Sequence, residues 1–317
     1  MRRGPALRRL QDLPGPPGWP VLGNAAQIKA PEFHLQLQRW AAEHGRYYKL
    51  RFGKNLVMVT ADHEAVAAMM RDRPDGFSRT SRLAVIGKEM GLPPGVFSSN
   101  GDVWKRQRRM VMASFDPVHV KRYFPALQSV SERLAGRWNQ AATHDAAIDL
   151  QSDLMRFTVD TIAGLAFGAE VNTLESDQDR IQQHLDKIFP MLFKRIFAPI
   201  PLHRWWRSSA DRALERSIVE VMAAVHGFVA QARARMSADP SLYQTPGNLL
   251  EAMIASADQP DSGISDQLVA GNVLTMLLAG EDTTANTLAI APLMDRVGFK
   301  AIDFTTSTHM GVAEIGR

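Results

Sequence analysis

The stretch LLAGEDTTANTLA, residues 277–289, places groups that can move protons within an otherwise apolar segment. Asp282 carries a carboxylate that can take up and release a proton, and Thr283 carries a hydroxyl that can donate and accept a hydrogen bond. Gly280 removes side-chain bulk, and a threonine hydroxyl can bond to the carbonyl three or four residues earlier and open the helix locally. The stretch therefore predicts a polar notch that handles a small polar molecule beside an apolar ligand.

The helix that carries this notch is predicted to begin at Ser265 and Asp266, which supply a capping oxygen and an early negative charge. The residues that follow are apolar on most sides of the helix, so we expect the helix to be buried. A buried Asp282 would be costly without a partner. A structural interpretation is equally open, in which the threonines cap a bend and Asp282 pairs with a core arginine.

A second candidate group lies in GDVWKRQRRMVMASF, residues 101–115, which is predicted to be helical. Trp104 and Arg108 are four residues apart and therefore share one helix face. An indole N–H and a guanidinium on one face can both donate to anionic oxygens. The alternative is a solvated basic helix without a ligand.

The elements elsewhere predict a mainly α fold with a small N-terminal β-sheet, in one domain. Residues 47–52 and 55–60 are rich in β-formers and flank Gly53-Lys54, which is typical of a hairpin with a two-residue turn. Proline and glycine make residues 14–24 an extended lead-in laid on a surface. Helical patterns cover residues 31–43, the segment from Asp62 to before Pro74, and residues 125–140, 147–168, 176–194 and 208–236.

Composition excludes several classes of site. The chain of 317 residues contains no cysteine, which excludes disulfides, thiolate nucleophiles, cysteine-ligated zinc and iron–sulfur clusters within it. A formal net charge of +4 does not suggest nucleic-acid binding. No run of about 18 apolar residues is present, so no transmembrane segment is predicted and a cytoplasmic protein is the default expectation. We predict no metal site formed by protein side chains.

Both candidate groups resemble the cytochrome P-450 haem-thiolate monooxygenases. AGEDTT, residues 279–284, is similar to the signature of that family's central long helix, and Trp104 and Arg108 match its haem-contacting helix. The lead-in at residues 14–24 and DGFSRTSR at residues 75–82 resemble two further family segments, in the same order along the chain. The resemblance implies a bacterial-type cytochrome P-450 fold over residues 14–289, C-terminally truncated.

The resemblance also implies a chemistry. Haem would activate O2 for hydroxylation of an apolar small molecule, with Asp282 and Thr283 as the proton-delivery pair. Trp104 and Arg108 would bind the haem propionates, and Ala279 and Gly280 would pack over the haem. Electrons would come from a separate ferredoxin or flavoprotein reductase, for which Arg106 and Arg109 are candidate contacts. The aromatic stretch at residues 189–206 suggests an apolar substrate, contact with a membrane surface, or core packing.

The chain departs from the family near its end, because the cysteine that ligates haem iron is missing and EIGR at residues 314–317 is a weak match to Glu-x-x-Arg. We therefore expect a flexible basic arm at residues 1–13, a partial domain at 14–289 and an unrelated tail at 290–317, without hydroxylase activity. The tail resembles the opening of the barrel of pyruvate carboxylase and hydroxymethylglutaryl-CoA lyase. The alternatives are a non-enzymatic helical fragment that binds a hydrophobic ligand or partner, and a lyase-type barrel fusion.

Overall fold

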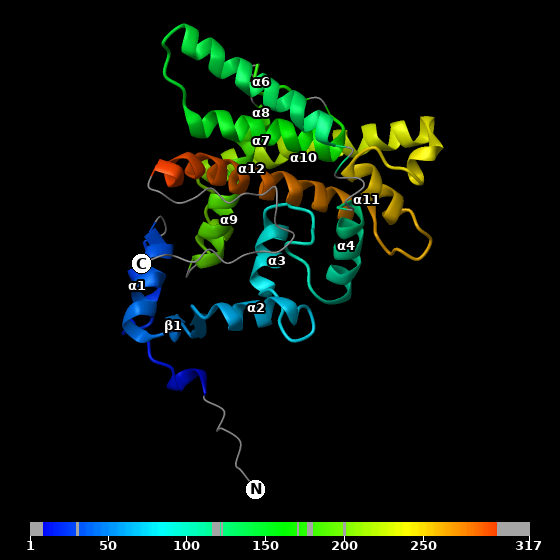
Figure 1. Ribbon diagram of the computed structural model, residues 1–317. Coiled ribbons are helices and arrows are strands. Elements are labelled where there is room, and N and C mark those ends of the chain that lie inside the picture. Colours follow the sequence, from blue (N-terminus) through cyan, green and yellow to red (C-terminus); the bar gives the residue numbers. More distant parts are fainter. Residues whose placement is uncertain are drawn as a thin grey trace. The chain divides into compact units, whose positions relative to one another are not determined.

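The computed structural model is mainly helical with one two-stranded antiparallel sheet near its N-terminus, which confirms the predicted fold class (Figure 1). It describes residues 9–29, 32–115, 121, 123–169, 171–175, 180–198 and 201–296. Most of the predicted basic arm, and the tail from residue 297 onward, lie outside these residues. The chain divides into two compact units: unit 1 is Met1–Arg109 with Asp186–Val221, and unit 2 is Met110–Leu185 with Met222–Arg317.

Unit 1 contains the predicted hairpin. Strands β1 (Tyr47–Phe52) and β2 (Asn55–Thr60) pair in register around Gly53 and Lys54, so the two-residue turn is confirmed. Helix α1 (Phe33–His44) packs Trp40 against Tyr48 and Leu50, which alternate on the buried face of β1. The Tyr48 hydroxyl donates to the Leu37 carbonyl at 2.9 Å, so the hydroxyl in this small core is satisfied.

The proline-rich lead-in lies along β1, as predicted, and ends in the short 3-10 helix η2 (Asn24–Gln27). The Lys49 amide donates to the Pro14 carbonyl at 2.8 Å. A Cβ at Gly15 would lie 2.2 Å from the Lys49 carbonyl oxygen, and one at Gly23 would lie 2.2 Å from the Arg51 carbonyl oxygen. The two glycines therefore allow the lead-in to approach β1 more closely than any other residue type would permit.

The remaining elements of unit 1 are mainly helices, whose bounds mostly agree with the periodicity. They are η1 (Leu10–Asp12), α2 (His63–Arg71), α3 (Ser81–Glu89), the first part of α4 (Gly101–Ser114), α9 (Ile188–Phe197), η4 (Leu202–Arg204) and the first part of α10 (Ser209–Ala238). Helix α3 is absent from the sequence prediction. It is tied to the end of α9, because Arg82 donates to the Ala198 carbonyl at 2.6 Å.

Helix α10 begins on a buried ion pair. Arg195 of α9 donates to Asp211 at 2.7 Å, and both side chains are buried. The other carboxylate oxygen of Asp211 accepts from the Ser208 amide at 2.9 Å, while the Asp211 amide donates back to the Ser208 hydroxyl at 3.1 Å. This reciprocal cap satisfies the backbone N–H groups of Ser208 and Asp211 at the start of the helix. The ion pair fixes α9 against α10.

Unit 2 is helical throughout the part that the structure describes. It consists of the end of α4, α6 (Phe124–Thr143), α7 (Leu150–Phe167), α8 (Arg180–Leu185), the rest of α10, η5 (Pro240–Tyr243), α11 (Leu249–Ala257) and α12 (Asp266–Arg296). The residue pattern predicts one helix over residues 176–194. This prediction is wrong in part, because Asp186 and Lys187 separate α8 from α9.

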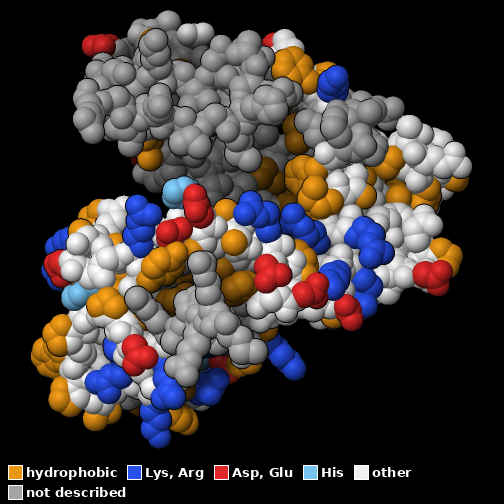
Figure 2. All heavy atoms as spheres, turned by 60° about the horizontal axis from the view of Figure 1, so that its bottom comes forward, with side chains coloured by type: hydrophobic (Ala, Val, Ile, Leu, Met, Phe, Trp, Pro, Cys, Tyr) orange, Lys and Arg blue, Asp and Glu red, His pale blue; other side chains and the backbone are white. Residues whose placement is uncertain are grey.

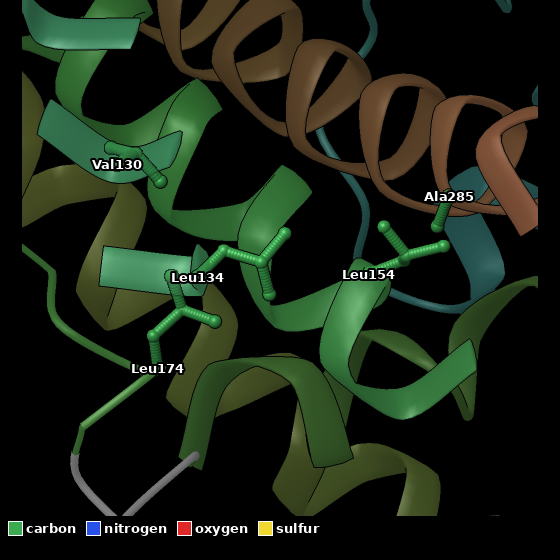
Figure 3. Close-up of a cluster of buried hydrophobic side chains, with 5 residues drawn as sticks. All are labelled: Val130, Leu134, Leu154, Leu174 and Ala285. Carbon is green, nitrogen blue, oxygen red and sulfur yellow. The ribbon is translucent and has the colours of Figure 1, made fainter. Parts of the chain in front are cut away.

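Helix α12, which carries the candidate notch, packs against α7 in unit 2 (Figure 1). Figure 3 shows part of the core around them, where Leu154 of α7 points toward Ala285 of α12 and Leu134 of α6 lies beside Leu174. Thr158 of α7 donates to the Glu281 carbonyl at 3.1 Å, which adds a polar contact between the same two helices. Helix α7 therefore sets the orientation of α12.

Candidate functional site

The predicted site residues fall in both units, and each group is described within its own unit. Trp104 and Arg108 lie on the part of α4 that belongs to unit 1. The Arg108 guanidinium carbon lies 5.3 Å from the centroid of the Trp104 ring, so the two side chains stack as a cation on an indole. The shared face that the spacing predicts is therefore present.

A third side chain, which the sequence analysis did not identify, joins this pair. The Arg73 guanidinium carbon lies 4.9 Å from the centroid of the Trp104 ring. The Nε and Nη2 atoms of Arg73 are buried and have no hydrogen-bond partner. A buried charged donor without a partner costs stability, so this cluster has capacity for an anion. Nothing in the sequence singles out Arg73, because its distance from Trp104 depends on how the loop between α2 and α3 folds.

The other two arginines proposed to contact a redox partner also lie on α4. Arg109 is exposed, and Arg106 is half-buried with its Nε atom lacking a partner. On the face drawn in Figure 2, Lys and Arg side chains lie among Asp, Glu and hydrophobic side chains, in agreement with the small net charge of +4. Whether Arg106 and Arg109 contact a redox partner stays a prediction.

The candidate notch lies on α12 in unit 2, and the expected burial of Asp282 is wrong. Asp282, Thr283 and Ala279 are exposed, whereas Glu281 is only 4% exposed. The cause is a change along the helix: it is buried on most sides as far as Leu278, and beyond this point only the face toward α7 is covered. The exposed carboxylate of Asp282 therefore needs no buried partner.

The threonines of the notch bond back to the helix backbone, as predicted, but α12 is an unbroken α-helix from Asp266 to Arg296, so the expected local opening is wrong. The Thr283 hydroxyl donates to the Ala279 carbonyl at 2.7 Å, and the Thr287 hydroxyl donates to the Thr283 carbonyl at 2.7 Å. These bonds hold each hydroxyl against the helix and compete with the normal backbone bonds for the same carbonyls. Thr283 and Ala279 thus form one hydrogen-bonded unit on the exposed face.

Gly280 has a packing role that the sequence did not predict. A Cβ placed on Gly280 would lie 1.7 Å from the Cδ1 atom of Ile162 on α7. The missing side chain is therefore what lets α7 and α12 approach at this point. Whether Gly280 and Ala279 also face a cofactor stays a prediction.

Among the residues that the structure describes, no three or more His, Asp or Glu side chains gather in a way that could hold a metal ion. In the same residues, no helix has both the length and the apolar character needed to cross a bilayer.

Comparisons with known proteins agree with the resemblance. The chain is 27% identical over 237 residues to cytochrome P450 CYP94D108 of Paris polyphylla, which covers 73% of this chain and 46% of that protein. It is 24% identical over 306 residues to cytochrome P450 704B1 of Arabidopsis thaliana, covering 88% of this chain and 56% of that protein. It is also 25% identical over 285 residues to the bifunctional cytochrome P450/NADPH–P450 reductase ascE of Acremonium egyptiacum, covering 87% of this chain and 26% of that protein.

The chain thus spans between 26% and 56% of the length of these three relatives. The relatives come from plants and fungi, so the comparisons lend no support to a bacterial-type origin. A sequence model described as cytochrome P450 matches residues 13–293, which include α4 and the notch on α12. With a match over most of its length, the chain belongs to the cytochrome P450 family.

Proposed function

We propose that this chain is the haem-binding and oxygen-activating part of a monooxygenase that hydroxylates an apolar small molecule. Family membership implies haem, and the residues of unit 1 fit its carboxylates. The observation that carries the proposal is the stack of Arg73 and Arg108 on Trp104, with Arg73 nitrogen atoms that have no partner. These donors match the charge and the hydrogen-bonding needs of propionate groups. When bound, haem supplies the redox chemistry that activates O2.

On α12, Thr283 would hold a proton near the reacting oxygen. Its hydroxyl donates to the Ala279 carbonyl, and its oxygen keeps lone pairs that can accept a hydrogen bond from a ligand or from water. To donate to a ligand instead, it must release the carbonyl, which costs about 1 kcal/mol of net hydrogen bonding. The chain thus offers a hydroxyl with two available orientations.

Asp282 would pass protons from solvent to this hydroxyl. It is exposed and adjacent to Thr283 in sequence, so its carboxylate is in contact with water. Ala279 would contribute the carbonyl that orients the hydroxyl, while Gly280 keeps the helix close to α7.

Aromatic side chains of unit 1 support an apolar substrate. The Phe189 ring lies edge-on to Phe97 at 6.4 Å between centroids and is tilted against Phe193 at 6.3 Å. Ring clusters of this kind present apolar surface with defined geometry. Electrons would come from a separate ferredoxin or flavoprotein reductase. Some relatives are named as bifunctional proteins with an NADPH–P450 reductase, so a covalently joined reductase is the alternative arrangement.

We further propose that the chain of 317 residues does not complete hydroxylation, since it contains no cysteine to ligate haem iron. Sequencing the gene beyond the codon for Arg317 shows whether a longer protein carries the ligand. A downstream Phe-x-x-Gly-x-Arg-x-Cys in the reading frame would restore it, and the proposed inactivity would then apply to these 317 residues alone.

Haem uptake by the purified chain tests the proposed function. Titration with iron(III) protoporphyrin IX should give a saturable Soret shift, and Arg108→Leu should weaken binding by about tenfold, as expected for one charge-assisted hydrogen bond. Arg109→Leu is the matched control, because Arg109 is an exposed arginine on α4, as Arg108 is, whereas Arg108 stacks on Trp104. Equal affinity in the two variants would contradict the role of Arg108.

A further inference from the structure

Two adjacent tryptophans of unit 1 lie mostly in solvent. Trp205 is 73% exposed and Trp206 is 78% exposed, and both lie between η4 and the start of α10. Tryptophan is on average a highly buried residue, and a folded chain in water gains nothing by exposing two of them in succession. Most of the surface of both indoles is therefore available to an external partner.

Ion pairs hold the two tryptophans in place from both sides. On the N-terminal side, Arg204 donates to Glu89 of α3 at 2.5 Å, and the His203 imidazole lies 3.1 Å from the same carboxylate. On the C-terminal side, Arg207 pairs with Glu215 of α10. Residues 204–207 thus form a fixed projection, and a fixed projection loses less conformational entropy on binding than a mobile loop does.

The segment around the tryptophans is basic. Residues 193–216 contain six Lys and Arg residues against two Asp and Glu residues, a formal charge of +4, which equals the net charge of the whole chain. This concentration of positive charge attracts an anionic surface. Five of the six basic side chains are exposed: Lys194, Arg204, Arg207, Arg212 and Arg216.

A lipid surface fits this combination of side chains better than a second protein does. Tryptophan is enriched at the membrane–water interface, where its ring lies among apolar groups, and nearby Lys and Arg side chains meet anionic headgroups. Two indoles bury about 300–500 Å² at most, whereas a stable protein interface needs about 800 Å² from each partner. A fluid bilayer adapts to the inserted rings and needs no complementary surface.

We propose that Trp205 and Trp206 insert into the headgroup region of an anionic phospholipid bilayer, and that the exposed Lys and Arg side chains around them attract the protein to it. This contact is reversible and requires no helix that spans the bilayer. It depends neither on haem nor on catalysis, so this inference and the proposed function can fail independently.

Flotation of the full chain with lipid vesicles tests the proposal. Vesicles of phosphatidylcholine alone are neutral, and vesicles of phosphatidylcholine mixed with phosphatidylglycerol are anionic. We expect the natural chain to bind the anionic vesicles about tenfold more tightly than the neutral ones. Replacing both tryptophans, Trp205→Ala with Trp206→Ala, should weaken binding to the anionic vesicles by about tenfold. Phe124→Ala is the matched control, because Phe124 is an aromatic residue of unit 2 that is 62% exposed, and it should leave binding unchanged.

A second double variant, Lys194→Gln with Arg216→Gln, separates charge attraction from ring insertion. Both side chains are exposed, and the ion pairs that hold residues 204–207 involve neither of them. This variant should bind the anionic vesicles about tenfold more weakly and should depend less steeply on salt concentration than the natural chain does. The tryptophan variant should keep the natural salt dependence, since it retains every charge.

Quenching of tryptophan fluorescence by brominated phosphatidylcholine in the anionic vesicles provides a measurement that needs no variant. Quenching is expected if the indoles insert, and its absence would overturn the proposal. The proposal is also wrong if the natural chain does not float with the anionic vesicles, or if the tryptophan variant binds them as tightly. Self-association without vesicles that the tryptophan variant abolishes would instead assign the two indoles to a contact between copies of this chain. Weaker binding in the tryptophan variant, but not in Phe124→Ala, supports the proposal.

Discussion

The contact between Gly280 and Ile162 allows a quantitative test of how α12 packs on α7. A Cβ on residue 280 would lie 1.7 Å from Cδ1 and 3.1 Å from Cγ1 of Ile162. Favourable carbon–carbon contacts lie at about 3.5–4.0 Å. In Gly280→Ala the Cδ1 atom must therefore move by about 2 Å, the difference between the 1.7 Å separation and a favourable contact. Rotation about the Cβ–Cγ1 bond can provide this movement but leaves the Cγ1 contact too short.

Two opposing contributions decide how far Gly280→Ala changes the free energy of unfolding. Overpacking a well-filled contact costs about 1–3 kcal/mol, and replacing a helical glycine by alanine gains up to about 1 kcal/mol. We therefore expect Gly280→Ala to lower the free energy of unfolding by about 1 kcal/mol. Gly136→Ala is the matched control, since a Cβ at this helical position of α6 would have no neighbour within 4 Å. It should raise the free energy of unfolding by up to about 1 kcal/mol.

A double-mutant cycle with Ile162→Ala isolates the contact. Removing both atoms that clash should turn Gly280→Ala from destabilising to stabilising, with a coupling energy of about 2 kcal/mol, within the range known for residues in contact. Urea unfolding followed by circular dichroism gives the four free energies. The reasoning is refuted if Gly280→Ala stabilises the natural chain as much as Gly136→Ala does, or if the coupling is zero.

Two further predictions concern unit 1. Asp211→Asn should cost about 3 kcal/mol at pH 7, because it leaves Arg195 buried without its counter-charge. Burial alone would raise the pKa of Asp211, but hydrogen bonds from Ser208 and Arg195 hold it well below its usual value. The stabilisation that the Asp211 carboxylate provides is thus present above about pH 4, and it is lost as the pH falls toward the pKa of Asp211 in the folded state. The difference between the natural chain and the variant should narrow by about 1 kcal/mol between pH 7 and pH 3 in urea unfolding, and a constant difference would contradict this assignment. Gly23→Ala should lower the free energy of unfolding by about 3 kcal/mol, since Gly23 has a φ of 65° and a Cβ there would lie 2.2 Å from the Arg51 carbonyl oxygen. An unchanged midpoint of urea unfolding would show that the lead-in is not packed on β1.

Local sequence signals predicted much of the fold. The hairpin turn at Gly53 and Lys54 follows from turn chemistry, and Asp62 caps α2 by accepting from the Ala65 amide at 3.0 Å. Helices α3 and α11 were missed because both are short, and α11 is buried on nearly all sides, so it has no amphipathic period to detect. A short helix without a polar face cannot be distinguished from a buried strand by pattern alone.

The candidate site was predictable where it depends on spacing along one helix. The stack of Trp104 and Arg108 and the back-bond of Thr283 are both relations between residues four apart. The exposure of Asp282 was not predictable, because it depends on which face of α12 is covered by α7. The approach of Arg73 to Trp104 was not predictable either, since Arg73 lies outside α4.

We propose that this chain binds haem through contacts between the haem carboxylates and α4, and that it lacks thiolate ligation. The most direct test is the absorption spectrum of the haem-loaded chain after reduction and addition of carbon monoxide. We predict a stable haem complex whose Soret band is not of the thiolate type, since the 317 residues include no cysteine. A thiolate-type band, or no uptake of haem at all, would contradict the account.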